Sequence, residues 1–138
     1  MAKTFTAPFA QSPKTATAVL TAACVIGTTG APTNTALLCT AGVDGALVTD
    51  ISAIPQSTLT ATGLVLFLST DAGVTKWPID SETMAAYSAG ATAKIPKTPF
   101  AAYTEQTPLR LAANARLYVG ALVAAASGIV FKAQSTDF

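Results

Sequence analysis

Residues 46–55 read ALVTDISAIP and give the clearest strand signal in the chain. They alternate between two faces with the period of two that a pleated strand imposes. One face would carry Leu47, Thr49, Ile51 and Ala53, and the other Val48, Asp50, Ser52 and Ile54. Pro55 cannot donate to a sheet ladder, so it marks an end. We therefore predict a β-strand over residues 46–54.

Further strand signals lie on both sides of this stretch, separated by turn residues. Leu64 to Leu68 form an apolar run that is typical of a strand covered on both faces. The predicted strands are residues 15–26, 35–41, 59–69, 75–79, 109–111, 116–124 and 129–133. Residues 91–103 carry two prolines, so we predict a loop there that includes an edge strand. Residues 80–87 begin with acids and continue with helix formers, so we expect a helix of two turns there.

The composition agrees with a sheet protein. Alanine and threonine supply 29 and 22 of the 138 residues, and they alternate with valine and leucine. Threonine and valine are stiff at χ1 and fit a pleated surface. Strands at regular spacing predict an all-β fold, a β-sandwich or jelly roll with one short helix. Residues 15–138 form the single domain of this prediction, and residues 1–14 form an extended N-terminal arm.

Few charges are available to keep copies of the chain apart. Charged residues make up 11% of the chain and the net charge is +1, whereas soluble domains carry about a quarter charged residues. Weak self-repulsion favours association. The basic residues are scattered, so no nucleic-acid surface is expected. The uncharged run 117–131 is too short for a spanning helix, and 16–26 fits a strand better than a signal core, so we expect no membrane segment.

The residue types offer little for catalysis. The chain contains no histidine, which removes the commonest general base and metal ligand. The seven carboxylates are dispersed, and a carboxylate pair for glycoside hydrolysis is an alternative that has no motif to support it. Asp44, Asp50 or Asp71 could hold calcium with loop carbonyls, but they do not form a recognised calcium loop. We therefore expect no enzyme activity, metal, cofactor or small-molecule substrate.

Cys24 and Cys39 flank the predicted first hairpin at equal distances from its centre. Opposed strand residues have Cβ atoms ~4.5–5.5 Å apart, which is marginal for a disulfide. Three states stay open: a disulfide within the chain, a crosslink between subunits, and two buried free thiols, which we favour. The aromatic residues Trp77, Tyr87, Tyr103 and Tyr118 could line a carbohydrate-binding surface, although core packing is the simpler interpretation.

The order of three segments resembles a family of small virion proteins of tailed bacteriophages. These segments are residues 46–55, the run LVLFLS at 64–69 and the run KWPID at 76–80. The likeness continues through TPLRL at 107–111, ARLYV at 115–119, GIVF at 128–131 and the final Asp137-Phe138, and it covers about residues 15–138. The two cysteines are not part of the family pattern.

The resemblance implies a β-sandwich and a structural role, with a capsid decoration (cement) protein as the leading expectation. Such proteins bind the capsid exterior, commonly as homotrimers, and stabilise the lattice because they bind only its assembled form. The partners would be the major capsid protein and further copies of this chain, and the chain would be made in the host bacterial cytoplasm. The candidate partner-contacting residues of the arm are Lys3, Phe5, Pro8, Phe9 and Pro13. A tail or baseplate component and a carbohydrate-binding adhesin module remain alternatives.

Overall fold

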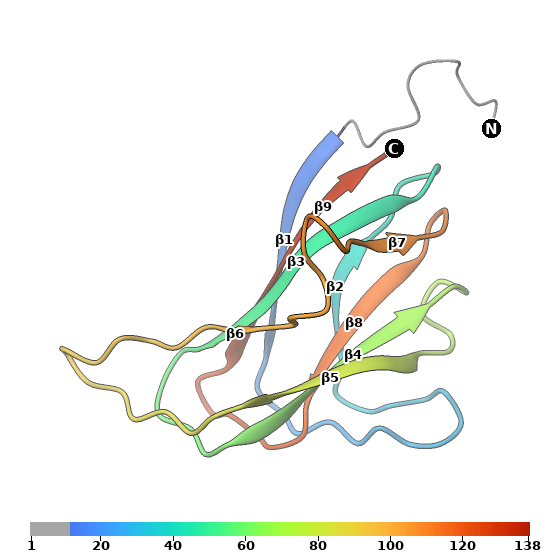
Figure 1. Ribbon diagram of the computed structural model, residues 1–138. Helices are drawn as coiled ribbons and strands as arrows, with labels where there is room; N and C mark the ends of the chain where they lie inside the picture. The colour runs from blue at the N-terminus through green and yellow to red at the C-terminus, as the bar shows by residue number, and fades with distance from the viewer. Residues whose placement is uncertain (1–11) are drawn as a thin grey trace.

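The fold of this chain is a β-sandwich of two antiparallel sheets (Figure 1). The computed structural model describes residues 12–138. The first sheet has the order β1-β9-β3, and β6 and β7 both pair with β3. The second sheet has the order β2-β8-β4-β5. The strands are β1 (Ser12–Leu20), β2 (Ala36–Thr40), β3 (Ala46–Pro55), β4 (Thr62–Ser69), β5 (Trp77–Met84), β6 (Thr98–Pro99), β7 (Leu109–Leu111), β8 (Arg116–Ala121) and β9 (Ile129–Asp137).

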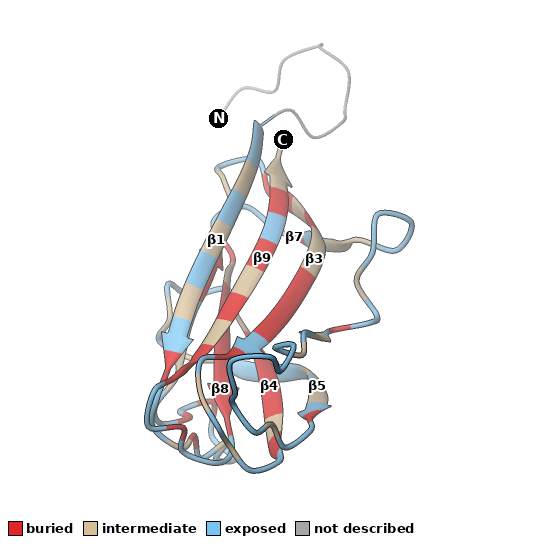
Figure 2. Cartoon of the chain, turned by 90° about the vertical axis from the view of Figure 1, so that its left-hand side faces the viewer, coloured by how far each residue is buried: buried red, intermediate tan, exposed pale blue. Residues whose placement is uncertain are grey.

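The inner faces of the two sheets meet in one hydrophobic core. Leu64 and Leu66 of β4 lie in it from the second sheet, and Ile129 and Phe131 of β9 lie in it from the first. All four side chains are fully buried. Figure 2 shows the resulting bands of buried and less buried residues along β3 and β9. This core confirms the predicted all-β sandwich.

A bulge in β3 changes the alternation expected from its sequence. The pairing of β3 with β9 shifts register between Val48 and Asp50, so Thr49 is an extra residue. Val48 therefore points into the core together with Ile51 and Ala53. The sequence prediction placed Val48 on the opposite face from Ile51 and was wrong for this half of the strand. An extra residue reverses the facing of every side chain beyond it.

The predicted helix at residues 80–87 is absent from the described chain. Strand β5 continues to Met84 and pairs with β4, with Asp80 opposite Leu66 and Glu82 opposite Leu64. The Asp80 carboxylate accepts the N–H of the next residue, Ser81, within the strand. The acidic start therefore resembled a helix cap, but pairing with a fully buried neighbour strand outweighed the local propensity.

The predicted first hairpin is also wrong. β1 ends at Leu20 in the first sheet, whereas β2 lies in the second sheet. The connection does reverse direction, as the bridge between Val25 and Thr33 shows. However, the N–H of Cys24 bonds to the carbonyl of Ala121, so this connection runs along the second sheet. Within the predicted strand end 21–26, Cys24 and Ile26 thus pack on the second sheet instead of extending β1.

The remaining predicted strands are present, but several of their ends move: β4 begins at Thr62 and not at 59, and β8 ends at Ala121 and not at 124. β9 extends to Asp137, four residues beyond its predicted end. β1 begins at Ser12, so residues 12–14 belong to the sandwich and not to the predicted arm. Pro13 is an exposed residue of β1 opposite Thr136 of β9. The other arm residues, Lys3, Phe5, Pro8 and Phe9, lie outside the described residues.

Candidate functional site

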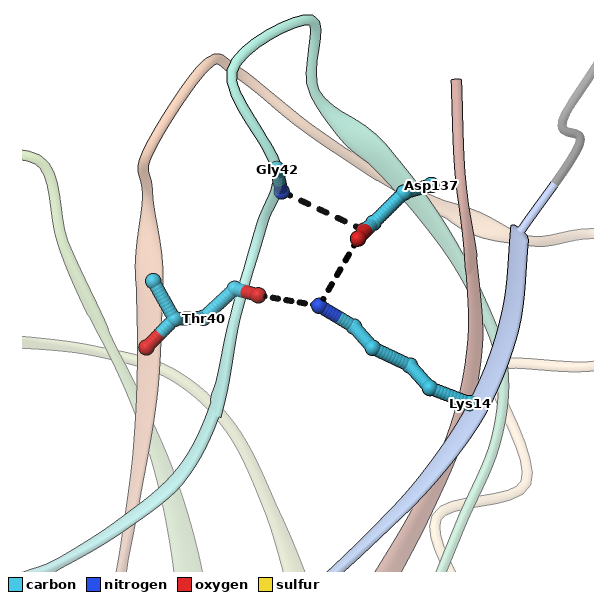
Figure 3. Close-up of polar contacts among 4 residues, drawn as sticks. All are labelled: Lys14, Thr40, Gly42 and Asp137. Carbon is cyan, nitrogen blue, oxygen red and sulfur yellow. Dashed lines mark hydrogen bonds and ion pairs between the residues drawn. The ribbon is translucent and has the colours of Figure 1, made fainter.

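A polar cluster joins the two sheets where β1 begins and β9 ends (Figure 3). The ammonium of Lys14 on β1 lies 3.0 Å from Oδ2 of Asp137 on β9. The same ammonium donates to the carbonyl of Thr40 on β2 at 2.5 Å. Asp137 also accepts the backbone N–H of Gly42 at 3.2 Å. We call these four residues the Lys14 cluster.

The Lys14 cluster is a polar contact between the two sheets. It connects β1 and β9 of the first sheet to β2 and the turn after it, and both charged side chains are partly exposed. The Lys14 amine satisfies a carbonyl of the edge strand β2, which would otherwise face solvent. Sequence reasoning placed Lys14 in the arm and missed this role, because nothing in the pattern joins positions 14, 40 and 137.

The two cysteines lie in different hydrophobic clusters. Cys39 belongs to the main core between the sheets. Cys24 belongs to a smaller cluster with Val65, Phe67 and Tyr118. Both thiols are free and buried. Burial raises the pKa of Cys39 to about 11 and raises the pKa of Cys24. Protonated, enclosed thiols are poor nucleophiles.

The four aromatic side chains considered for carbohydrate binding do not gather on one face. Tyr118 is buried in the small cluster beside Cys24. Tyr103 packs against the main core, and burial raises its pKa, followed by the charge of Asp80 and a hydrogen bond to it. Tyr87 forms a bridge with Leu59 beyond the far end of β5 from Trp77. Only Trp77 is strongly exposed, at 51%.

The acidic residues weighed as calcium ligands are separated in the fold. Asp50 lies 3.5 Å from the ammonium of Lys132. Asp71 accepts hydrogen bonds from Ser69 and from both the N–H and the hydroxyl of Thr75. Asp44 is exposed in the turn between β2 and β3. Within residues 12–138, no group of three or more His, Cys, Asp or Glu side chains could hold a metal ion.

An open hollow on the second sheet is the best candidate contact surface. Its volume is about 550 Å³. Gly63 and Val65 of β4 lie in its lining, directly opposite Thr83 and Ser81 of β5. Apolar side chains stand around it: Ile26, Ile79 and Leu122. We call this surface the β4–β5 hollow.

The lining of the β4–β5 hollow is mixed: apolar side chains stand around it, and residues 80–83 of β5 give it a polar, partly acidic side. Ile79 and Leu122 are both exposed, at 38% and 42%. Gly63 allows Leu122 to lie over the sheet, because a Cβ there would approach Leu122 Cδ1 to 2.8 Å. Apolar residues that gather on a surface mark contact sites more often than isolated ones do. Sequence reasoning did not identify this surface, because its walls come from three separate connections and strands.

A second hollow lies over β3 and β9 of the first sheet and is mainly polar. Asp50, Gln134 and Lys132 line it from the two strands, and Glu105 and Lys97 line it from the connections after β6 and before it. Its charges are mixed, so it favours neither a cation nor an anion. No helix among residues 12–138 is long and apolar enough to cross a membrane.

The chain was compared with protein-family models, with curated proteins and with solved structures. No family model and no curated protein matches it. A solved structure of infectious bursal disease virus, Gt strain, contains a chain that matches with 13% identity and a TM-score of 0.31. The match covers 98% of this chain but 35% of the viral one, so this chain spans about a third of that protein's length. A TM-score of this size does not establish a common fold.

Proposed function

We propose that this chain is a structural virion protein of a tailed bacteriophage that binds the exterior of the capsid as a decoration protein. The observation that carries the proposal is the β4–β5 hollow, an open surface of mixed polarity on one sheet, with the apolar side chains of Ile79 and Leu122 exposed beside it. Such a surface suits the docking of a protein lattice better than the binding of a small solute, because it is open and shallow. The major capsid protein would be the partner.

The low charge of the chain supports the same proposal. With a net charge of +1, close packing of many copies on a capsid costs little electrostatic repulsion. A protein that binds only the expanded lattice stabilises that lattice by mass action. In this mechanism the chain acts by bridging neighbouring capsid subunits, and it performs no chemical step.

The experiment is binding of the purified chain to expanded capsids that lack it, measured by co-sedimentation. The capsids come from the phage whose genome encodes the chain. We expect Leu122→Lys and Ile79→Lys to weaken binding by about tenfold or more, because each places a charge in an apolar contact. Val74→Lys is the matched control, because Val74 is 76% exposed in the turn before β5, outside the hollow. Melting curves would show that all three variants fold.

Two outcomes would overturn the capsid assignment. In the first, the wild-type chain fails to sediment with capsids at any concentration. In the second, the native chain co-purifies with tails and not with heads, which would establish the tail or baseplate alternative. Electron microscopy of the assembled particle, with the chain labelled by a fused tag, would locate it directly.

The arm is tested separately, with its boundary set by the structure. Removing residues 2–11 leaves β1 and the Lys14 cluster intact, whereas removal through residue 14 would also delete three paired residues of β1, Lys14 among them. We expect the shorter deletion to weaken capsid binding with the melting temperature unchanged. Unchanged capsid occupancy would exclude the arm from the mechanism.

Trp77 supports a second candidate function, binding of a carbohydrate. Its indole is half exposed and lies against Gly30, where a Cβ would approach the ring to 2.9 Å. An exposed indole can stack on a sugar ring. Glycan-array binding that Trp77→Ala abolishes, with folding retained, would favour an adhesin over a decoration protein.

A further inference from the structure

The sandwich has four sheet edges, and three of them carry features that prevent another strand from adding. Such protection normally takes the form of short strands, bulges, prolines or inward-pointing charges. The outer edge of β3 is covered by the short strands β6 and β7. β2 has five residues, a register shift between Leu37 and Cys39, and the Lys14 ammonium on its Thr40 carbonyl.

The edge strand β5 is protected in another way. It contains Pro78, and its pairing with β4 shifts register between Leu66 and Phe67. Asp80 and Glu82 lie opposite the core residues Leu66 and Leu64, so their carboxylates are on the inner side of this edge strand. Both an edge proline and inward charges discourage the approach of another strand.

The fourth edge, β1, is long and regular and has no such protection beyond its start. It pairs with β9 over nine consecutive residues without a register shift. Pro13 and Lys14 lie near the start of β1. The Lys14 side chain does not protect the edge, because it contacts Asp137 and Thr40. Residues 15–20, TATAVL, carry no charge, proline or glycine. In the described chain, no backbone hydrogen bond joins the far side of β1 to another segment.

We propose that the free edge of β1 pairs with the β1 edge of a second copy of this chain. The pairing is antiparallel about a two-fold axis at Thr17. It joins the five-stranded sheet of one copy to that of the other into one continuous sheet, and it leaves the four-stranded sheet of each copy unchanged. This arrangement goes beyond the proposed capsid role and does not depend on it. It supplies partners for the backbone N–H and C=O groups that β1 leaves open.

The sequence of β1 is compatible with its own reverse. With Thr17 at the centre, Thr15 lies opposite Val19 of the second copy, and Lys14 lies opposite Leu20 and not opposite another lysine. Like charges therefore do not meet, and Thr–Thr and Thr–Val are favourable cross-strand pairs. The side chains of Thr15, Thr17 and Val19 are exposed on the outer face of the first sheet, so pairing at the edge removes none of them from the core.

A single added strand pair is smaller than a standard interface of ~1,600 Å², so the dimer is expected to depend on concentration. Sedimentation of the full chain from about 10 µM to about 1 mM would show the average mass rising towards twice the monomer mass. A chain that remains monomeric throughout this range would overturn the proposal. So would a stable trimer whose mass does not change when Thr17 is substituted.

Charge variants at the centre of the edge make the test specific. Thr17→Lys and Thr17→Glu each place like charges opposite each other, and we expect each to weaken self-association by about tenfold. Mixing the two variants should restore dimers, because opposite charges then meet. Val74→Lys is the matched control, because Val74 is 76% exposed in the turn before β5 and outside β1 and the hollow, and it should leave self-association unchanged. Failure of the mixture to associate above either variant alone would sink the β1–β1 arrangement.

These results remain distinguishable from the capsid experiment. Thr17 is not part of the β4–β5 hollow, so loss of capsid binding in Leu122→Lys with normal self-association would support both proposals. Self-association without any capsid binding would retain the β1 pairing alone.

Discussion

The ammonium of Lys14 lies 3.0 Å from Oδ2 of Asp137, although 122 residues lie between the two positions along the chain. The pair ties the first strand to the last, and through Thr40 it also ties both to the other sheet. The chain thus closes its sandwich at one end with a polar contact instead of an apolar one.

Replacing Lys14 with methionine should destabilise the fold by about 1 kcal/mol. The variant loses a partly exposed ion pair and a hydrogen bond to Thr40 but keeps the apolar stem. Chemical denaturation measures the free energy of unfolding. A double-mutant cycle with Asp137→Asn would show coupling between the two sites. Strictly additive changes in the free energy of unfolding would contradict a direct interaction between Lys14 and Asp137.

Gly120→Ala should destabilise the chain by about 1–3 kcal/mol through overpacking. A Cβ at this position in β8 would approach Cys24 Sγ to 2.8 Å and Phe67 Cε2 to 3.2 Å. Gly90→Ala is the control, because its nearest neighbour would be Ala93 Cβ at 3.8 Å. Thermal unfolding compares the two. Equal melting temperatures would show that residues 21–35 do not pack on this sheet as described.

The stability of the chain should fall between pH 9 and 11 because of Cys39. Its pKa is raised to about 11 from 9.0, so the folded state holds the thiol proton more tightly than the unfolded state. This contribution is present below pH 9 and is lost as pH rises through the folded pKa. Cys39→Ala should flatten that part of the pH profile. An unchanged slope in the variant would assign the effect to other groups.

Both thiols should resist modification until the chain unfolds. Cys24 and Cys39 are each buried and free, and a buried protonated thiol reacts slowly. A thiol-reactive dye should therefore label neither cysteine rapidly in the native state and both after denaturation, without added reductant. Fewer than two thiols after denaturation would instead indicate a disulfide or a crosslink between subunits.

The turn between β4 and β5 should lose local stability in acid. Hydrogen bonds from the hydroxyl and N–H of Thr75, and from Ser69, lower the pKa of Asp71 to about 2 from 3.8. The stabilising contribution is present above pH 3.8 and is lost as pH falls towards 2. NMR titration of the Asp71 carboxyl would measure this directly. Thr75→Val should move the pKa upwards, and an unchanged pKa would exclude Thr75 as its main cause.

The sequence predicted most strands but not how they are distributed between sheets. The alternation of residues 46–54 and the apolar run at 64–68 are local properties, and both segments are strands in the structure. The pairing of β1 with β9 and of β2 with β8 joins segments more than 70 residues apart. Local patterns carry no information about such partners, so two strands adjacent in sequence were predicted as a hairpin.

The candidate sites likewise divide into features that residue type reveals and features that depend on non-local packing. The cysteines were identified by residue type, but their separation depended on which face of the second sheet each one occupies. The β4–β5 hollow takes its walls from Ile26, Ile79 and Leu122, which are unremarkable apolar residues in the sequence. Their role appears only when three distant segments lie side by side.

The sequence by itself determined an all-β chain of low charge with no histidine, because residue type and a period of two are readable along the chain. Tertiary structure alone decided that 80–84 is strand and not helix, because pairing with buried β4 outweighs a local cap signal. It also decided that Lys14 meets Asp137 and that β1 is left as a free edge. Those outcomes depend on non-local pairing, whose free energy comes from burying both sheets in one core.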